Sequence, residues 1–319
     1  MKRRDFLMGS ALAPLMLNNT YGAAPVKVLL DTDIGSDIDD AVALSYLLVQ
    51  KRCQLLGITT VSGKATQRAM LASALSHAAA REIPIYPGAE NPLIIQQTQP
   101  EAPQSKKLSM WPHKKNFEQG KAIAFMRKTI RDNPGEVTLL AVGPFTNIAL
   151  LFMVDPEIPK LLKELVIMGG KYSDYPTPWG PTEWNAIVDP HATDIVLRQP
   201  DLKIRAFGLD ITWRVSMTPK EVAHKFEQNT LLRIVHDWSK VWFEDRELLH
   251  FHDPLAAVAI FNPEVCQYTK GNVQVELDDE KLLGVTHFEP SKNGHIRVAT
   301  GIDSTMFFNK YFKPFGINA

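Results

Sequence analysis

Five aspartates lie within ten residues near the start of the chain, in the segment DTDIGSDIDD at positions 31–40. An apolar run at residues 26–30 precedes them and is typical of a buried strand, and residues 41–48 after them are typical of a helix. The aspartates are therefore predicted on a strand-to-helix turn at the carboxyl end of a strand, where open α/β sheets bind their ligands.

Carboxylates this close together repel one another unless a cation neutralises them. Carboxylate oxygens bind hard cations, and an irregular set of protein ligands favours Ca²⁺ over Mg²⁺. The alternative is a solvated acidic turn that caps the following helix, since Asp is favoured at helix N-termini. The density of carboxylates directly after a buried strand favours the metal site. An EF-hand loop is excluded, because its sixth position is Ser36 instead of Gly and its twelfth is Val42 instead of Glu.

Segments with strand and helix character alternate from the first strand to residue 208. This alternation predicts an α/β fold with an open, mostly parallel sheet flanked by helices. Residues 273–298 contain three strand-like runs and are expected to form a small antiparallel appendage. Residues 92–117 are polar and aperiodic, so we expect a surface excursion there, followed by a helix at residues 118–132. A single domain at residues 25–319 is predicted.

Three local signals place helices in the second half of the chain. Thr218 and Pro219 begin a capping box, Asp253 is predicted as an N-cap before Pro254, and residues 231–248 are expected to be helical. A final helix is expected after Asp303.

The charge balance bears on partners and compartment. Acidic and basic residues are equal in number, at 35 each, so the basic surface of a nucleic-acid-binding protein is not expected. No long apolar run follows the first 24 residues, so no stable membrane span is predicted. Cys53 and Cys266 could pair in an oxidising compartment, although two unpaired thiols are the favoured interpretation.

Residues 1–24 are interpreted as a targeting segment. The sequence KRRDFL at residues 2–7 resembles the twin-arginine export signature, and the mildly apolar stretch after it is too short to span a bilayer. Small residues near Ala23 and Ala24 suit cleavage. The alternative is a disordered basic N-terminus. Export would place the protein in the periplasm or outside the cell.

The acidic turn and five later segments, in this order, resemble the inosine–uridine-preferring nucleoside hydrolases. Those segments are AVGPFTNIA at 141–149, MGG at 168–170, EWN at 183–185, DP at 189–190 and HDPL at 252–255. The acidic turn departs from the family pattern D-x-D-P-G-x-D-D, because Ile34 replaces the proline and Asp37-Ile38 resembles a two-residue insertion. The resemblance implies metal-dependent hydrolysis of the N-glycosidic bond of a nucleoside or related ribosyl compound, and a homo-oligomer.

The resemblance also implies roles around the metal. Asp33 matches the residue that accepts a proton from water and also touches the ion. Asp40 and Asp253 match metal ligands, together with the main-chain carbonyl of Val142. Asp39 matches the residue that holds a ribose hydroxyl, although the insertion leaves open whether Asp37 or Asp39 occupies that position.

Glu183 and Asn185 match residues that hydrogen-bond the sugar, and His252 is placed to contact the departing base or the sugar. Lys64 departs from the family pattern V-x-G-N, which has asparagine at this position, because this chain reads VSGK at residues 61–64. We expect Lys64 to pair with Asp33 or Asp37, or to face an anionic substituent such as phosphate on the substrate. A solvent-facing lysine is the third possibility.

The family also usually has an asparagine ahead of E-x-N, which is missing here. Five tryptophans are candidates for a wall on which a nucleobase stacks: Trp179, Trp184, Trp213, Trp238 and Trp242. Trp238 and Trp242 share a helical face, so ordinary core packing is favoured for these two.

Two other functions remain open at this point. A haloacid dehalogenase-type phosphatase also begins with strand-D-x-D, but the chain contains no Gly-Asp dipeptide of the kind that family needs. A non-catalytic exported nucleoside- or sugar-binding protein is the second alternative, because the sugar-binding residues depart from the family pattern.

Overall fold

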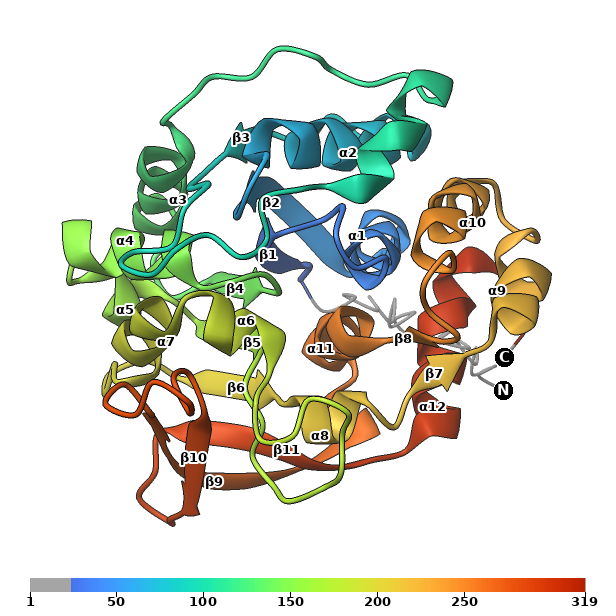
Figure 1. Cartoon of the computed structure of the whole chain (residues 1–319). Coiled ribbons are helices and arrows are strands. Elements are labelled where there is room, and N and C mark those ends of the chain that lie inside the picture. The colour runs from blue at the N-terminus through green and yellow to red at the C-terminus, as the bar shows by residue number, and fades with distance from the viewer. Residues whose placement is uncertain (1–23, 319) are drawn as a thin grey trace, which may run out of the picture.

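The computed structural model describes residues 24–318 of the 319. The predicted targeting segment therefore lies almost entirely outside the described residues. A nine-stranded sheet forms the centre, in the order β10-β9-β11-β6-β5-β4-β1-β2-β3 (Figure 1). Its strands are β1 Val26–Thr32, β2 Cys53–Thr60, β3 Ile85–Pro87, β4 Val137–Ala141, β5 Glu164–Met168, β6 Ile204–Phe207, β9 Cys266–Val275, β10 Thr286–Pro290 and β11 Ile296–Ile302.

Strands β1 to β6 are parallel, which confirms the predicted fold class. β1 pairs with β2 on one side and with β4 on the other, so the chain order reverses there. Such a switch point opens a crevice outside the carboxyl ends of the two central strands. The acidic turn follows β1 directly and therefore lies in this crevice.

The predicted antiparallel tail continues the main sheet. β11 pairs parallel with β6 and antiparallel with β9, and β10 pairs antiparallel with β9. Its first strand begins at Cys266, earlier than the expected residue 273. A second, two-stranded ribbon joins β7 Ser216–Met217 to β8 Leu249–His250.

Helices cover both faces of the sheet, and the apolar side chains of β1 alternate between the two cores that result. Val28 and Leu30 enter one core and Leu29 enters the other. In Figure 1 α1 and α11 lie on one face of the sheet, and α3, α4 and α7 lie on the other. The first face carries α1 Asp39–Val49, α2 Ala65–Ala78, α10 Thr230–Trp242, α11 His252–Phe261 and α12 Ser304–Phe312. The second face carries α3 Ala122–Arg131, α4 Thr146–Val154, α5 Ile158–Leu161 and α7 Pro190–Leu197.

Shorter helices complete the chain: α6 Trp184–Val188, α8 Leu209–Thr212 and α9 Pro219–Phe226. The predicted capping box of α9 is confirmed, since Thr218 and Glu221 each accept a backbone hydrogen bond from the other residue. The final helix after Asp303 is also confirmed, with the Asp303 side chain accepting from the Met306 N–H.

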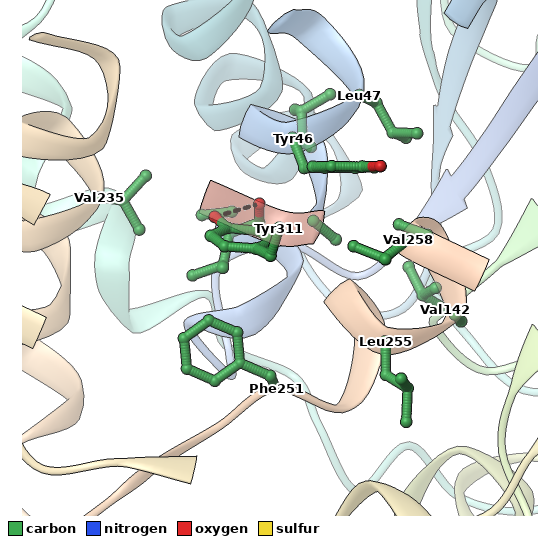
Figure 2. Packing of buried hydrophobic residues seen from close by; sticks show 14 of the residues in the cluster. Tyr46, Leu47, Val142, Val235, Phe251, Leu255, Val258 and Tyr311 are labelled. Atoms are coloured by element: carbon green, nitrogen blue, oxygen red, sulfur yellow. Dashed lines mark hydrogen bonds between the residues drawn. The ribbon is translucent and has the colours of Figure 1, made fainter. Parts of the chain in front are cut away.

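The packing of α1 against α11 fixes the two helix starts that carry the acidic residues. Tyr46 of α1 and Leu255 of α11 lie in the same buried cluster (Figure 2). Phe251, directly before α11, is fully buried, and its ring centroid lies 5.5 Å from that of Tyr311 and 5.9 Å from that of Phe307. This aromatic anchor holds the start of α11 beside the start of α1.

Three helix predictions need correction. Helix α11 begins at His252 with Phe251 as its N-cap, so Asp253 does not cap it and its carboxylate is free for other contacts. Helix α10 ends at Trp242 because the chain turns into β8, and the Trp242 indole N–H donates to the Leu248 carbonyl oxygen at 2.9 Å. Helix α3 begins at Ala122, after Gly120, whose φ of +67° interrupts the expected helix.

The excursion at residues 92–117 contains a 3₁₀ helix, η1 Pro103–Met110, and is irregular elsewhere. It is not purely a surface segment, since Gln99, Ala102 and Gln104 are buried. Cys53 and Cys266 are both buried and unpaired, as favoured from the sequence. Within the described chain, the helices are all too short or too polar to cross a bilayer.

Candidate active site

A pocket of about 630 Å³ lies at the carboxyl ends of the parallel strands. It brings together eight of the nine residues predicted for the site, although they come from four separate parts of the chain. They are Asp33, Asp39, Asp40, Val142, Glu183, Asn185, His252 and Asp253. Its outer walls are aromatic, and its floor is acidic.

The floor contains three buried carboxylates from two helix starts. Oxygens of Asp39, Asp40 and Asp253 all lie within 4.8 Å of one another. Asp39 and Asp40 are the first two residues of α1, and Asp253 is the second residue of α11. Helix N-termini favour negative charge, which partly offsets the crowding.

The remaining repulsion is visible in the acid–base properties of the cluster. Burial, and then the charges of Asp39 and Asp40, raise the pKa of Asp253 well above its usual range. Burial is also the first cause of the raised pKa values of Asp39 and Asp40. Three buried, hard oxygen donors that repel one another fit a divalent cation of the Ca²⁺ type.

The cluster also bears on the ambiguity between Asp37 and Asp39. Asp39 belongs to the group of three, and its Oδ2 accepts the Asp253 backbone N–H at 2.9 Å. Asp37 lines the pocket outside this group, and its Oδ1 accepts the backbone N–H groups of Ile38 and Asp39. Asp39 is therefore placed to bind a cation, whereas the resemblance implied that it holds a ribose hydroxyl.

Asp33 lies beside the cluster, one residue after the end of β1. Its Oδ2 accepts a hydrogen bond from the Gln99 side-chain amide. Burial raises the pKa of Asp33, while the charge of Arg68 and the Gln99 hydrogen bond act in the opposite direction. A Cβ added to Gly143 would lie 2.9 Å from Asp33 Oδ1, so glycine at this position lets β4 end close to the carboxylate.

Arg68 is a fully buried guanidinium behind the acidic turn, which the sequence analysis missed. It donates to the carbonyl oxygens of Asp33, Gly63 and Glu101, the last two at 2.7 and 2.9 Å. These three oxygens belong to the acidic turn, the β2–α2 turn and the excursion. Arg68 thus joins three loops and places a positive charge behind the carboxylates.

Glu183 is the N-cap of α6, and it receives three backbone N–H bonds. Its oxygens accept from Gly170 at 2.8 Å, Asn185 at 2.9 Å and Ala186 at 3.0 Å. A carboxylate offers about four acceptor positions, so one remains for a ligand hydroxyl. Burial raises the pKa of Glu183 to about 6, and these three bonds act against the rise.

Asn185 uses its amide hydrogens within the protein. Its Nδ2 donates to the Val142 carbonyl oxygen at 2.8 Å and to the Met168 carbonyl oxygen at 3.1 Å. This leaves the Asn185 Oδ1 as the free acceptor. The Val142 carbonyl, predicted as a metal ligand, lies in the pocket wall next to this amide.

His252 forms part of a stack of three rings. The Trp213 and His250 centroids lie 3.8 Å apart, and those of His250 and His252 lie 5.3 Å apart. Burial lowers the pKa of His252 to about 3, so the ring is neutral at pH 7. Its Nδ1 is hydrogen-bonded to the Thr212 hydroxyl at 2.7 Å, which orients Nε2 as the free ring nitrogen.

The candidate tryptophans occupy two environments, the pocket and the core, and the sequence predicted these only in part. Trp179, Trp184, Trp213 and Trp242 line the pocket, whereas Trp238 is fully buried in the core. Trp242 thus faces the pocket despite sharing a helix with Trp238.

Lys64 is the predicted site residue that the structure places elsewhere. Its Nζ lies 3.2 Å from Glu101 Oε2, with both side chains substantially exposed. The expected pairing with Asp33 or Asp37 is not the one observed. Its backbone has a φ of +59°, at the start of α2. Among the described residues that line the pocket, Lys64 does not occur.

Comparison with known proteins gives a consistent result. Residues 28–309 match the family model described as inosine-uridine preferring nucleoside hydrolase. An uncharacterized protein of Schizosaccharomyces pombe is 30% identical over 278 residues, which cover 82% of this chain and 88% of that protein. The inosine-uridine preferring nucleoside hydrolase of Crithidia fasciculata is 28% identical over 306 residues, covering 89% and 95%. A solved plant nucleoside hydrolase, PpNRh1, superimposes with a TM-score of 0.80 at 25% identity, covering 91% of this chain and 99% of that one.

Proposed function

The chain belongs to the family of inosine-uridine preferring nucleoside hydrolases, whose members are N-glycosyl hydrolases, and we propose that it uses Ca²⁺ to hydrolyse an uncharged nucleoside. The observation that carries the proposal is the meeting of Asp33 with the cluster of Asp39, Asp40 and Asp253 in one pocket. A proton acceptor and a set of anionic oxygen ligands are the two elements that the reaction requires.

Hydrolysis breaks the bond between C1′ of the sugar and a nitrogen of the base. The electron pair of that bond leaves with the base, a water oxygen bonds to C1′, and the sugar passes through an oxocarbenium-like transition state. Asp33 accepts the proton of the water, since its Oδ2 is held by Gln99 and its Oδ1 remains available. General-base catalysis of this kind contributes about 10²–10⁴-fold to a rate.

The residues that would hold the cation are Asp39, Asp40 and Asp253, with Asp33 and the Val142 carbonyl beside them. A divalent cation bound there would lower the pKa of a water molecule next to Asp33, which would make its proton easier to remove. It would also offset the repulsion that, after burial, raises the pKa values of the three carboxyl groups.

The sugar and the base have separate partners. Glu183 and Asn185 each keep one free acceptor position for a sugar hydroxyl. His252 is neutral and can donate a hydrogen bond to the departing base. Trp213 and the other pocket tryptophans supply the faces on which a base stacks.

The charges around the pocket favour an uncharged substrate. Within the described chain its lining includes one guanidinium, that of Arg246, against nine carboxylates: Asp33, Asp37, Asp39, Asp40, Glu101, Glu183, Asp245, Glu247 and Asp253. One bound divalent cation would leave this surface negative. The phosphate-bearing substrate that Lys64 suggested is therefore disfavoured, because Lys64 is held by Glu101.

The experiment that tests the proposal compares the wild type with Asp33→Asn. Asn is nearly isosteric but cannot accept the proton, so we expect release of free base to fall by about 10²-fold or more while the fold is kept. Calorimetric titration with CaCl₂ should give about one site per chain. Turnover by Asp33→Asn at the parental rate would contradict the assignment. Nucleoside binding by the wild type without release of base would instead indicate a non-catalytic binding protein.

Two further proposals concern the location and the assembly of the protein. We propose export through the twin-arginine route to the periplasm or beyond, supported by the KRRDFL motif at residues 2–7. We also propose assembly as a homo-oligomer, supported by the family resemblance.

A further inference from the structure

We infer that Gln99 is a positioning residue for Asp33 and that the Trp184 indole holds Gln99 in place. The inference rests on the proposed function, in which Asp33 accepts the proton. It adds to the site a relay of two hydrogen bonds, from the Trp184 indole N–H to Gln99 and from Gln99 to Asp33.

The chemistry of the three groups leaves one orientation for the Gln99 amide. The Trp184 indole nitrogen can only donate, so it must face the amide oxygen, and Gln99 Oε1 accepts from it. The amide nitrogen then faces Asp33 Oδ2 and donates to it. An ionised carboxylate only accepts, so this orientation matches the form of Asp33 that can take up a proton.

The segment that carries Gln99 is tied to the acidic turn at several points. Gln99 is 7% exposed, and its backbone carbonyl accepts from the Ser62 hydroxyl at 3.4 Å. Five residues later, Gln104 donates through its backbone N–H to the Gly35 carbonyl and through its side chain to the Ser36 carbonyl, both at 3.2 Å. These bonds make the excursion a fixed part of the site.

Glycine at position 63 allows this close approach. A Cβ on Gly63 would lie 2.5 Å from the backbone of Pro100, a distance that real Cβ atoms do not reach. The β2–α2 turn therefore contacts the excursion directly at the residue after Gln99. Lys64, next to Gly63, is the position where the family has asparagine. Here an amide from the excursion reaches Asp33 while Lys64 pairs with Glu101.

The relay also connects Asp33 to the sugar-binding region. Trp184 lies between Glu183 and Asn185 in the chain, at the start of α6. The residue is 41% exposed, and its ring centroid lies 6.2 Å from that of Trp179. A change at the pocket mouth can thus reach Asp33 through two hydrogen bonds.

Three variants of the full chain test the inference: Gln99→Glu, Trp184→Phe, and Gln96→Glu as the charge-matched control on the same segment. Gln96 is exposed and is not among the described residues that line the pocket. Gln99→Glu places a carboxylate against Asp33, so we expect kcat and Ca²⁺ affinity to fall by about 10–100-fold with little change in KM. Trp184→Phe keeps a ring but removes the donor, and kcat should fall by about 2–10-fold. Gln96→Glu should behave as the wild type.

A readout independent of activity keeps the inference separate from the proposed function. In protein labelled with ¹⁵N-tryptophan, the Trp184 indole resonance is assigned by its loss in Trp184→Phe. We expect Asp33→Asn to shift this resonance, although Asp33 does not touch Trp184, and we expect the other indole resonances to stay in place.

The outcomes are distinct. Wild-type protein that releases no base overturns the proposed function, and the indole shift then still decides whether the relay exists. An unshifted indole resonance in Asp33→Asn overturns the relay. So does a folded Gln99→Glu with parental kcat and Ca²⁺ affinity, or a Trp184→Phe that alters KM alone. If Gln99→Glu fails to fold, Trp184→Phe and the indole shift still decide between these results.

Discussion

Replacing Asp253 by asparagine should change the stability of the protein in opposite directions with and without Ca²⁺. The Asp253 carboxylate has two carboxylates within 4.8 Å, those of Asp39 and Asp40. At that separation two ionised groups repel by about 3.5 kcal/mol at an effective dielectric constant of about 20. Protonation already relieves part of this repulsion, since the pKa of Asp253 is raised, so we expect a gain of about 1–2 kcal/mol in the metal-free variant.

With Ca²⁺ the order should reverse. A ligand present at 100 times its dissociation constant stabilises the folded state by about 2.7 kcal/mol. For a domain of this length that is about 5 °C in Tm, at about 2 °C per kcal/mol. The asparagine variant has lost one of three anionic ligands and should lose most of this increment.

Thermal unfolding of both proteins, in EDTA and in saturating CaCl₂, measures the effect. Asp245→Asn is the matched control, because Asp245 is an exposed carboxylate at the pocket mouth and outside the cluster. An Asp253→Asn protein that is less stable than the wild type in EDTA, or that gains as much from Ca²⁺ as the wild type does, would contradict a shared cation site at these three carboxylates.

Four further outcomes are expected. In EDTA the wild type should lose stability as the pH rises above 3.8, the pKa of an aspartate in the unfolded chain. Above that pH the unfolded state releases a proton that the folded state keeps, because the pKa of Asp253 is raised in the folded state. Urea unfolding at several pH values measures the effect. Arg68→Met should cost about 3–5 kcal/mol in urea unfolding, because three buried carbonyl oxygens lose their donor; a change below 1 kcal/mol would contradict its role. Lys64→Asn should change stability by about 0–1 kcal/mol and create no activity on nucleotides, as the loss of an exposed ion pair predicts. Asp155→Asn should flatten the acid limb of the stability profile: hydrogen bonds from Arg131 lower the pKa of Asp155, so its contribution is complete above the unfolded value of 3.8 and is lost as the pH falls below it.

The central sheet was predictable because its strands are buried on both faces. Val28, Leu29 and Leu30 form a continuous apolar run, and their alternation between two cores needs no information beyond the sequence. The turn after β1 was predictable for a similar reason, since a run of carboxylates after a buried strand has few stable environments.

Contacts between distant segments were not predictable from local patterns. Residues 243–248 contain good helix formers, yet α10 stops at Trp242 because Leu249 and His250 pair with β7. The sequence HDPL matches an N-cap followed by proline, but Phe251 takes the cap position because its ring is held by α12. In both cases tertiary packing overrides the local helix and capping preferences of the sequence.

The same limit applies to the site. Asp33, Asp40 and Asp253 carried recognisable motifs, whereas Gln99 lies in an aperiodic polar stretch that offers no signal. A signal for Arg68 did exist, as a single arginine in the alanine-rich α2, but its partners are three carbonyl oxygens that no sequence pattern marks. Lys64 was expected near Asp33 because the two parallel strands end side by side, and its partner Glu101 comes from the excursion instead.

An assay of base release in phosphate-free buffer containing CaCl₂ tests the proposed hydrolase activity most directly. Uridine, cytidine, inosine and adenosine are compared with their 5′-monophosphates, and base and sugar are separated by chromatography. We expect stoichiometric base and ribose from at least one free nucleoside, much slower release from its monophosphate, and loss of activity in Asp33→Asn. Release of base from the monophosphates alone, or from none of the compounds, would contradict it.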